Sequence, residues 1–238
     1  MIFDKLLTVV IPCKNEGMTL VKTLRSLDKS YGIYNKLRVI IADVSDDNGY
    51  TERCINEDKF NNIGVEMVRG GLPAVGRNNG AKLVTTKYVL FLDADIFLFN
   101  ECILMDMVLK MERDNLHLGT VKFRTEFGDY DYVYKCFDVI QGFTKKKNPF
   151  AVGGFMLFDT DEFNHLGGFN EEDKFAEDYH LSSRIDPTRF YIDKYHTAYT
   201  TSRRFVNKGL WYMVKMMVKS YLNRNNPEFF KKDHNYWN

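Results

Sequence analysis

Apolar residues gather in short runs that alternate with amphipathic stretches along the first 95 positions. The run at 88–92 is apolar without alternation, which is typical of a strand buried on both faces of a parallel sheet. Stretches 16–27 and 74–84 have the character of helices, with leucines at helical spacing in the first. Strands are predicted at 6–12, 37–42, 63–68 and 88–92. Alternating strands and helices predict βαβ units with right-handed crossovers.

The pattern is less regular after residue 95. We predict helices at 101–111, 130–142, 177–185 and 207–222, and strands at 118–127, 150–158, 190–192 and 198–200. No internal repeat or low-complexity linker separates these elements. The sequence therefore predicts one α/β domain over 1–205, followed by a C-terminal helical extension over 206–238.

Composition fits an ordinary globular protein of one sizeable core. The 238 residues are 45% apolar, 27% charged and 15% aromatic, and the net charge of +1 gives no general argument for a nucleic-acid partner. Residues 203–232 include eight Lys or Arg and a single acidic residue, Glu228, so the extension is basic. Four separated cysteines, no signal-peptide layout and no apolar run of about 20 residues lead us to expect a cytoplasmic protein.

Two carboxylates follow the most apolar run directly. Asp93 and Asp95 come after the strand predicted at 88–92, and open α/β sheets bind ligands at the carboxyl ends of such strands. Neighbouring carboxylates repel each other unless a cation or hydrogen-bond donors compensate, and a hard divalent ion that also binds substrate phosphates is the usual partner. A turn in which aspartate caps the next helix is the alternative interpretation.

Four separated blocks carry a family resemblance. They are TVVIPCKNE at 8–16, GGLPAVGRNNGAKLVTTKYVLFLDAD at 70–95, VGGFMLFDTDEFNHLGGFNE at 152–171 with AEDYHLSSRI at 176–185, and YTTSRRF at 199–205. In this order they resemble glycosyltransferase family 2. The resemblance implies the GT-A fold, a Rossmann-like mixed sheet flanked by helices. It also implies metal-dependent, inverting transfer of a sugar from a nucleoside diphosphate, UDP above all, to an acceptor hydroxyl.

The resemblance assigns roles around the metal and the phosphates. Asp95 would bind Mn²⁺ or Mg²⁺ directly, and Asp93 would contact the donor ribose or bind the metal through water. His196 is a further candidate ligand, with a purely structural role as its alternative. Arg203 would reach the diphosphate or simply begin the basic tail. Gly154 would allow the backbone to approach the sugar, or would mark a β-bulge.

The nucleoside is expected at the ends of the earlier strands. Pro12 and Glu16 match the first loop of the family, with Glu16 on the ribose. Asp43 matches the carboxylate that contacts the base, although the usual D-D-G-S is here A-D-V-S, and an Asx turn is an equal alternative. Arg77 and Asn78 match the A-R-N segment, where an arginine near a helix start would bind phosphate.

A second acidic pair completes the expected site. By resemblance, Asp178 is the general base that takes the acceptor proton, and Glu177 holds the acceptor or a lid at 145–148. An acidic first helical turn, favoured by the helix dipole, is the alternative.

The acceptor is left open by the sequence. A glycan or lipid precursor and a hydroxymethylated base in DNA are the options. The C-terminal helix can pack on the body, form a homodimer contact, or lie at the anionic inner face of a membrane. Because the Q-x-x-R-W motif and membrane spans of processive synthases are missing, we expect one sugar per encounter. A nucleotidyltransferase and a non-catalytic binding module are the rival functions.

Overall fold

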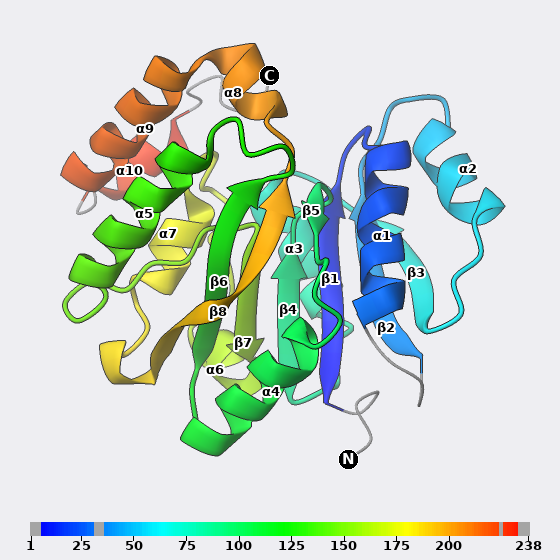
Figure 1. Ribbon diagram of the computed structural model, residues 1–238, viewed down its shortest axis with the longest axis horizontal. Coiled ribbons are helices and arrows are strands. Elements are labelled where there is room, and N and C mark those ends of the chain that lie inside the picture. The colour runs from blue at the N-terminus through cyan, green and yellow to red at the C-terminus, as the bar shows by residue number, and fades with distance from the viewer. Residues whose placement is uncertain (1–5, 31–35, 224–225, 233–238) are drawn as a thin grey trace.

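The computed structural model describes residues 6–30, 36–223 and 226–232. Within these ranges one mixed sheet has helices on both faces (Figure 1). Its strands are β1 (Leu7–Cys13), β2 (Leu37–Asp43), β3 (Ile63–Arg69), β4 (Tyr88–Leu92), β5 (Ile96–Phe97), β6 (Leu118–Thr125), β7 (Phe155–Asp159) and β8 (Phe190–Thr200). The order across the sheet is β3-β2-β1-β4-β7-β6-β8-β5.

The described helices connect these strands or follow them. They are α1 (Met18–Ser30), α2 (Tyr50–Glu57), α3 (Pro73–Ala81), α4 (Ile103–Asp114), α5 (Asp131–Thr144), α6 (Thr160–His165), α7 (Glu177–Ser182), α8 (Arg203–Lys208), α9 (Leu210–Leu222) and α10 (Pro227–Lys231). None of the helices in the described ranges is both long and apolar enough to span a bilayer.

The first half of the chain forms the parallel part of the sheet. Strands β3, β2, β1 and β4 pair in parallel, and every residue of β4 is buried. Helix α3 packs closely on β1, because Gly80 has no side chain: a Cβ there would lie 2.4 Å from Cγ1 of Val10. Pro12 does not end β1 as predicted. It lies opposite Ala42, and the strand continues to Cys13.

The second half adds antiparallel pairing. Strand β7 runs antiparallel to both β4 and β6, and β6 runs parallel to β8. The two short strands predicted over 190–200 are one strand of 11 residues. The strand predicted at 150–158 begins only at Phe155, and Gly153 and Gly154 form the turn before it.

The C-terminal extension packs on the body at one end of the sheet. Phe175, Met216 and Phe230 form a small core of their own, Nζ of Lys231 lies 2.8 Å from Oε2 of Glu172, and Figure 1 shows α8 to α10 grouped with α5. The single helix predicted at 207–222 is interrupted, because Gly209 takes a φ of +80° between α8 and α9.

Candidate functional site

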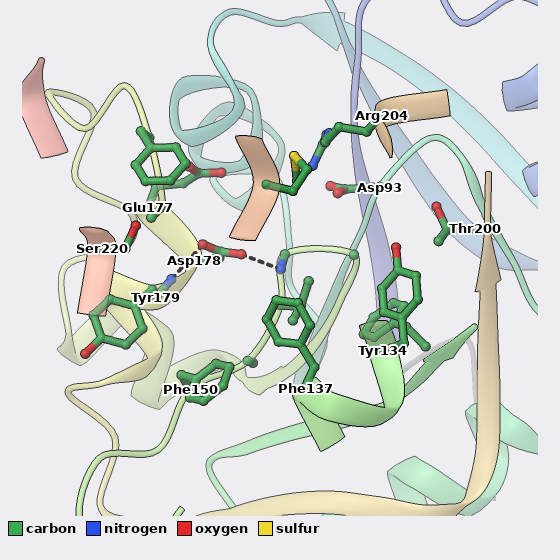
Figure 2. Close-up of a pocket in the computed structure, with 18 of the residues that line it drawn as sticks. Asp93, Tyr134, Phe137, Phe150, Glu177, Asp178, Tyr179, Thr200, Arg204 and Ser220 are labelled. Carbon is green, nitrogen blue, oxygen red and sulfur yellow. Dashed lines mark hydrogen bonds between the residues drawn. The ribbon is translucent and has the colours of Figure 1, made fainter. Parts of the chain in front are cut away.

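A cavity of about 570 Å³ lies beyond the carboxyl end of β4. Its polar end consists of charged and hydroxyl side chains: Arg77, Asp93, Asp95, Glu177, Asp178, Thr200, Thr201 and Arg204. Its apolar side, contributed largely by α5, α9 and the segment before β7, includes Phe123, Phe137, Ile140, Phe150, Met213 and Val218. Figure 2 shows Asp178 between Asp93 and the rings of Phe137 and Phe150. The cavity therefore joins two chemically different environments.

The turn after β4 presents both of its aspartates to this cavity. The amide of Asp93 donates to the carbonyl of Gly154 at 3.3 Å, and the amide of Ile96 donates to the carbonyl of Asp93 at 3.2 Å. Strand β5 begins at once, so the turn is fixed on both sides. Asp93 and Asp95 are each partly exposed, at the polar end.

Arg77 joins the two acidic pairs. Its side chain is 1% exposed, with Nη2 2.6 Å from Oδ1 of Asp93 and Nη1 2.5 Å from Oε1 of Glu177. The guanidinium also lies over the ring of Phe169, 5.3 Å from its centroid. Both arms of the guanidinium therefore contact protein carboxylates, and Arg77 connects the two acidic pairs at the polar end of the cavity, where the sequence also predicts a phosphate contact. Glu177 is likewise buried against Arg77, and it lines the cavity in which the sequence predicts that it holds the acceptor or a lid.

Asp178 is held by two backbone donors. Its Oδ2 accepts from the amide of Gly153 at 2.6 Å, and its Oδ1 accepts from its neighbour's amide, that of Tyr179, at 2.7 Å. Burial raises the pKa of Asp178 above its ordinary value, and the positive charge of Arg77 opposes this rise. The carboxylate is partly exposed and lines the cavity, so its geometry suits a general base.

Neighbouring side chains leave little room for a Cβ at the two glycines before β7. A Cβ on Gly153 would lie 2.9 Å from Nη2 of Arg77 and 3.2 Å from Oδ2 of Asp178. A Cβ on Gly154 would lie 2.9 Å from the ring of Phe123. Side chains of the protein thus fill the space beside both glycines. Because Gly154 also lines the cavity, the approach of its backbone to a sugar stays a prediction.

Asp95 lies in a group of mixed charge. Its Oδ2 accepts from the hydroxyl of Thr201 at 3.1 Å and lies 3.9 Å from Nη2 of Arg203. That same nitrogen is 2.7 Å from Oε1 of Glu16. Burial and then the charge of Asp93 raise the pKa of Asp95. Glu16 and Arg203 thus reach the site, and Oε2 of Glu16 is buried without a hydrogen-bond partner among the described residues.

Asp43 forms a local turn, the Asx turn that the sequence offers as the alternative to base binding. Its Oδ1 accepts from the hydroxyl of Ser45 at 2.6 Å and from the amide of Ser45 at 3.3 Å, which is an Asx-type turn. It stands opposite Cys13 in the parallel register, so it shares the sheet edge of Pro12.

Two expected ligands lie elsewhere or are already occupied. His196 places Nε2 3.2 Å from Asp106 and Nδ1 3.0 Å from Asp193. It comes four residues before Thr200 on β8, about 13 Å along a strand, so it does not complete the metal site. The side-chain amide of Asn78 binds the backbone of Phe169 through its nitrogen at 2.8 Å and its oxygen at 3.0 Å. These two bonds fix that loop to α3 and give Asn78 a structural role.

The donor set fits a metal that shares its coordination with substrate. Within the described ranges, no group of three or more His, Cys, Asp or Glu could hold a metal alone. Asp93 and Asp95 supply hard carboxylate oxygens at the same end of the cavity, and burial and then the charge of Asp93 raise the pKa of Asp95. Mg²⁺ and Mn²⁺ accept such oxygens and complete their shell with phosphate and water.

The aromatic wall of the cavity escaped the sequence-based site prediction. Phe137, on the cavity wall, belongs to the aromatic-rich stretch predicted as helix 130–142, and Phe123, Phe150 and Phe205 join it from other elements. The aromatic content of 15% and the aromatic-rich stretch at 130–142 were the signals, but neither shows which rings meet.

Comparison with known proteins decides the family. The sequence profile described as "Glycosyl transferase family 2" matches residues 8–167. The chain belongs to glycosyl transferase family 2. The profile match of this family 2 chain includes Arg77, Asp93 and Asp95 but ends before the second acidic pair. Glu177 and Asp178 therefore lie outside the residues that the family profile matches.

Relatives of this family 2 chain include a curated enzyme of Mycoplasma genitalium. It is named "Processive diacylglycerol beta-glycosyltransferase" and is 26% identical over 179 residues, which is 72% of this chain and 49% of the relative. The family 2 chain thus spans about half the length of the curated relative that it matches.

Solved structures show the same fold. TarS of S. aureus, residues 1–349 with UDP, has a TM-score of 0.63 at 19% identity, covering 82% of this chain and 60% of that one. The mannosyltransferase PcManGT of Pyrobaculum calidifontis, with GDP-Man and Mn²⁺, has a TM-score of 0.65 at 17% identity, covering 90% and 64%. The mixed sheet flanked by helices is therefore the GT-A fold, as the sequence predicted, and the chain is a glycosyltransferase domain.

Proposed function

We propose that this domain transfers a sugar from a nucleoside-diphosphate donor, with UDP as first choice, to an acceptor hydroxyl. The observation that carries the proposal is that Asp178 and the pair Asp93 and Asp95 line one cavity. Arg77 joins them by binding Asp93 and Glu177. A base and a phosphate-side charge cluster that share one cavity can serve the same sugar.

The donor diphosphate is proposed to lie at the polar end. Asp93 and Asp95 would hold Mn²⁺ or Mg²⁺ through the oxygens that Arg77 and Thr201 leave open. When bound, this cation would neutralise the charge that develops on the leaving diphosphate. Arg203, beside Asp95 and Glu16, is placed to approach the same diphosphate.

The nucleoside is proposed to extend toward the ends of β1 and β2. The buried Oε2 of Glu16 would accept a hydrogen bond from a ribose hydroxyl, because a buried carboxylate oxygen is costly to leave unpaired. Asp43 and Pro12 share the adjacent sheet edge, where a base would lie beyond the ribose.

Asp178 is proposed as the general base. The acceptor oxygen forms a bond to the anomeric carbon, the bond from that carbon to the diphosphate oxygen breaks, and the acceptor proton moves to Asp178. Attack from the face opposite the leaving group inverts the anomeric configuration. Arg77, Gly153 and Glu177 keep the base in position.

Number of sugars and location belong to the same proposal. We expect one sugar per encounter; because the relative from M. genitalium is named as processive, the masses of the products provide the test. We also propose a location in the cytoplasm, where nucleotide sugars are made, and the four unpaired cysteines agree with it.

A donor screen tests the proposal. Melting temperature is measured with UDP-sugars and with GDP-mannose, each with Mn²⁺, with Mg²⁺ and with a chelator. A true donor raises the melting temperature because it binds only the folded state, and we expect the rise to need a metal. Asp95→Asn should lose the metal-dependent part, whereas Asp161→Asn, on α6, should keep it. No shift with any donor and metal, together with no donor hydrolysis, contradicts the proposal.

A further inference from the structure

The apolar side of the cavity is not explained by the donor. A nucleoside diphosphate and a sugar are polar, and their expected partners lie at the polar end and along β1 and β2. Phe137, Phe150 and Met213 line much of the remaining space, and among its polar side chains Asn148 and Tyr179 are hydrogen-bonded to each other. Sugar hydroxyls placed among these side chains would give up water for few hydrogen bonds, which is costly. The occupant of this side must therefore be largely apolar.

The mouth of the cavity lies between two helices. Ile140 on α5 and Val218 on α9 both line the cavity, and they are 47% and 52% exposed. A side chain that is half exposed and also lines a cavity marks its rim. A molecule with a polar head at Asp178 would thus extend its apolar part toward the surface between α5 and α9.

The outer surfaces of these two helices are also apolar. On α5 the exposed residues Tyr132, Val139 and Phe143 recur at i, i+7 and i+11, and on α9 Trp211, Val218 and Leu222 have the same spacing. That spacing puts each set on one helix face. Phe143 is 83% exposed and Trp211 is 82% exposed, so each ring adds a large apolar area to its face, and a contiguous apolar patch marks an interaction site.

Lysines border both apolar faces. Lys215 and Lys219 are exposed on α9 beside its apolar face, and Lys146 and Lys147 are exposed just after α5. Exposed aromatic residues flanked by lysines are the composition of helices that lie in the interface of an anionic bilayer. A DNA duplex would contact the lysines through its phosphates but leave the rings in water.

We propose that the acceptor is a lipid drawn from an anionic bilayer, with its hydrocarbon chain on the apolar side of the cavity and its hydroxyl at Asp178. The membrane would contact the apolar faces of α5 and α9 at the mouth between them. This inference rests on the proposed function, because it names the acceptor of the same site.

Vesicle binding tests the docking surface. The chain is sedimented with phosphatidylcholine vesicles, with and without phosphatidylglycerol, over a range of salt concentrations. We expect binding to need phosphatidylglycerol and to weaken with salt. The double variant Phe143→Ser and Trp211→Ser should bind at least about tenfold more weakly. Tyr195→Ser removes a ring that is 87% exposed on β8 and should bind like the parent.

Binding of a chain-length series tests the cavity. Dissociation constants of n-alkyl β-glucosides, from methyl to octyl, are measured by titration calorimetry below their micelle concentrations. Each added methylene should tighten binding about three- to fourfold until the apolar side is filled. Val218→Lys, at the mouth, should flatten this dependence.

The outcomes separate the two proposals. Affinity that is independent of chain length, or equal vesicle binding by the double variant and the Tyr195 variant, overturns the lipid acceptor. A dimer that forms through α5 and α9 and is lost in the double variant does the same. In each case metal-dependent donor binding would remain, and the proposed sugar transfer would stand without a lipid.

Discussion

The two sides of the cavity are built in opposite ways. At the polar end, Arg77 and Glu177 are buried and paired at hydrogen-bond distance. On the apolar side, Ile140 and Val218 are half exposed. The polar end is therefore fixed by specific long-range contacts, whereas the apolar side depends on general apolar character. This difference teaches that the chemical step should tolerate little change, while recognition of the acceptor should tolerate more.

Removing the proposed base should have the largest effect on activity. Asp178→Asn keeps the size of the side chain but removes its basicity, so the transfer rate should fall by about 10²- to 10⁴-fold. Donor affinity, measured by thermal shift, should change little because the base faces the acceptor. A loss below tenfold would assign the base to another group.

Breaking the buried ion pairs should mainly affect stability. Arg77→Met leaves the buried carboxylate of Glu177 unpaired, and the free energy of unfolding should fall by about 3–5 kcal/mol. Arg25→Met removes an exposed partner of Asp58 and should cost about 1 kcal/mol or less. Urea unfolding of both variants provides the measurement, and equal losses would contradict the central position of Arg77.

A single methyl group should displace the base. Gly153→Ala places a carbon 2.9 Å from Arg77 and 3.2 Å from Asp178, and a shifted base should slow transfer about ten- to a hundredfold. Gly142→Ala on α5 is the matched control, since a Cβ there meets nothing within 4 Å. It should leave the rate unchanged and stabilise the helix by about 0.5–1 kcal/mol. Equal rates in the two variants would separate Gly153 from catalysis.

The transfer rate should depend on pH through the ionisation of Asp178. Burial raises the pKa of Asp178, and only its ionised form accepts a proton. The rate should therefore be full above the raised pKa and fall about tenfold for each pH unit below it. The decline should begin above the ordinary aspartate pKa of about 3.9. A rate profile that stays flat down to that value would contradict the assignment.

The parallel half of the fold could be predicted closely from the sequence. The strands at 37–42, 63–68 and 88–92 carry local apolar runs, and their positions agree with β2, β3 and β4. The sequence predicts strand β8 as two pieces, because the polar residues between 192 and 198 interrupt the apolar pattern. In the structure β8 is one strand, and it pairs with β6 at 190–192 and again at 197–200, with a register shift between the two stretches.

The sequence predicted those site residues whose place next to a strand end or a helix start brings them to the cavity. Asp93, Asp95 and Asp178 line the cavity, and a buried strand or a helix start carries each of them there. The partners of Arg77 and Asn78 could not be predicted, since both bind residues about 90 to 100 positions away in the chain. The position of His196 was equally hidden: of the two carboxylates that it contacts, Asp106 on α4 is far away in sequence.

The bend at Gly209 separates two tasks along a short piece of chain. Before it, α8 begins with Arg203 next to Asp95; after it, α9 provides the rim of the cavity. Exchanging residues 210–222 for those of another family member would then redirect the enzyme to a new acceptor while its handling of the nucleotide stayed as it was. Within the proposed function, variation in this segment would change one wall of the acceptor side, while α5 and Phe150 would keep the other walls as they are.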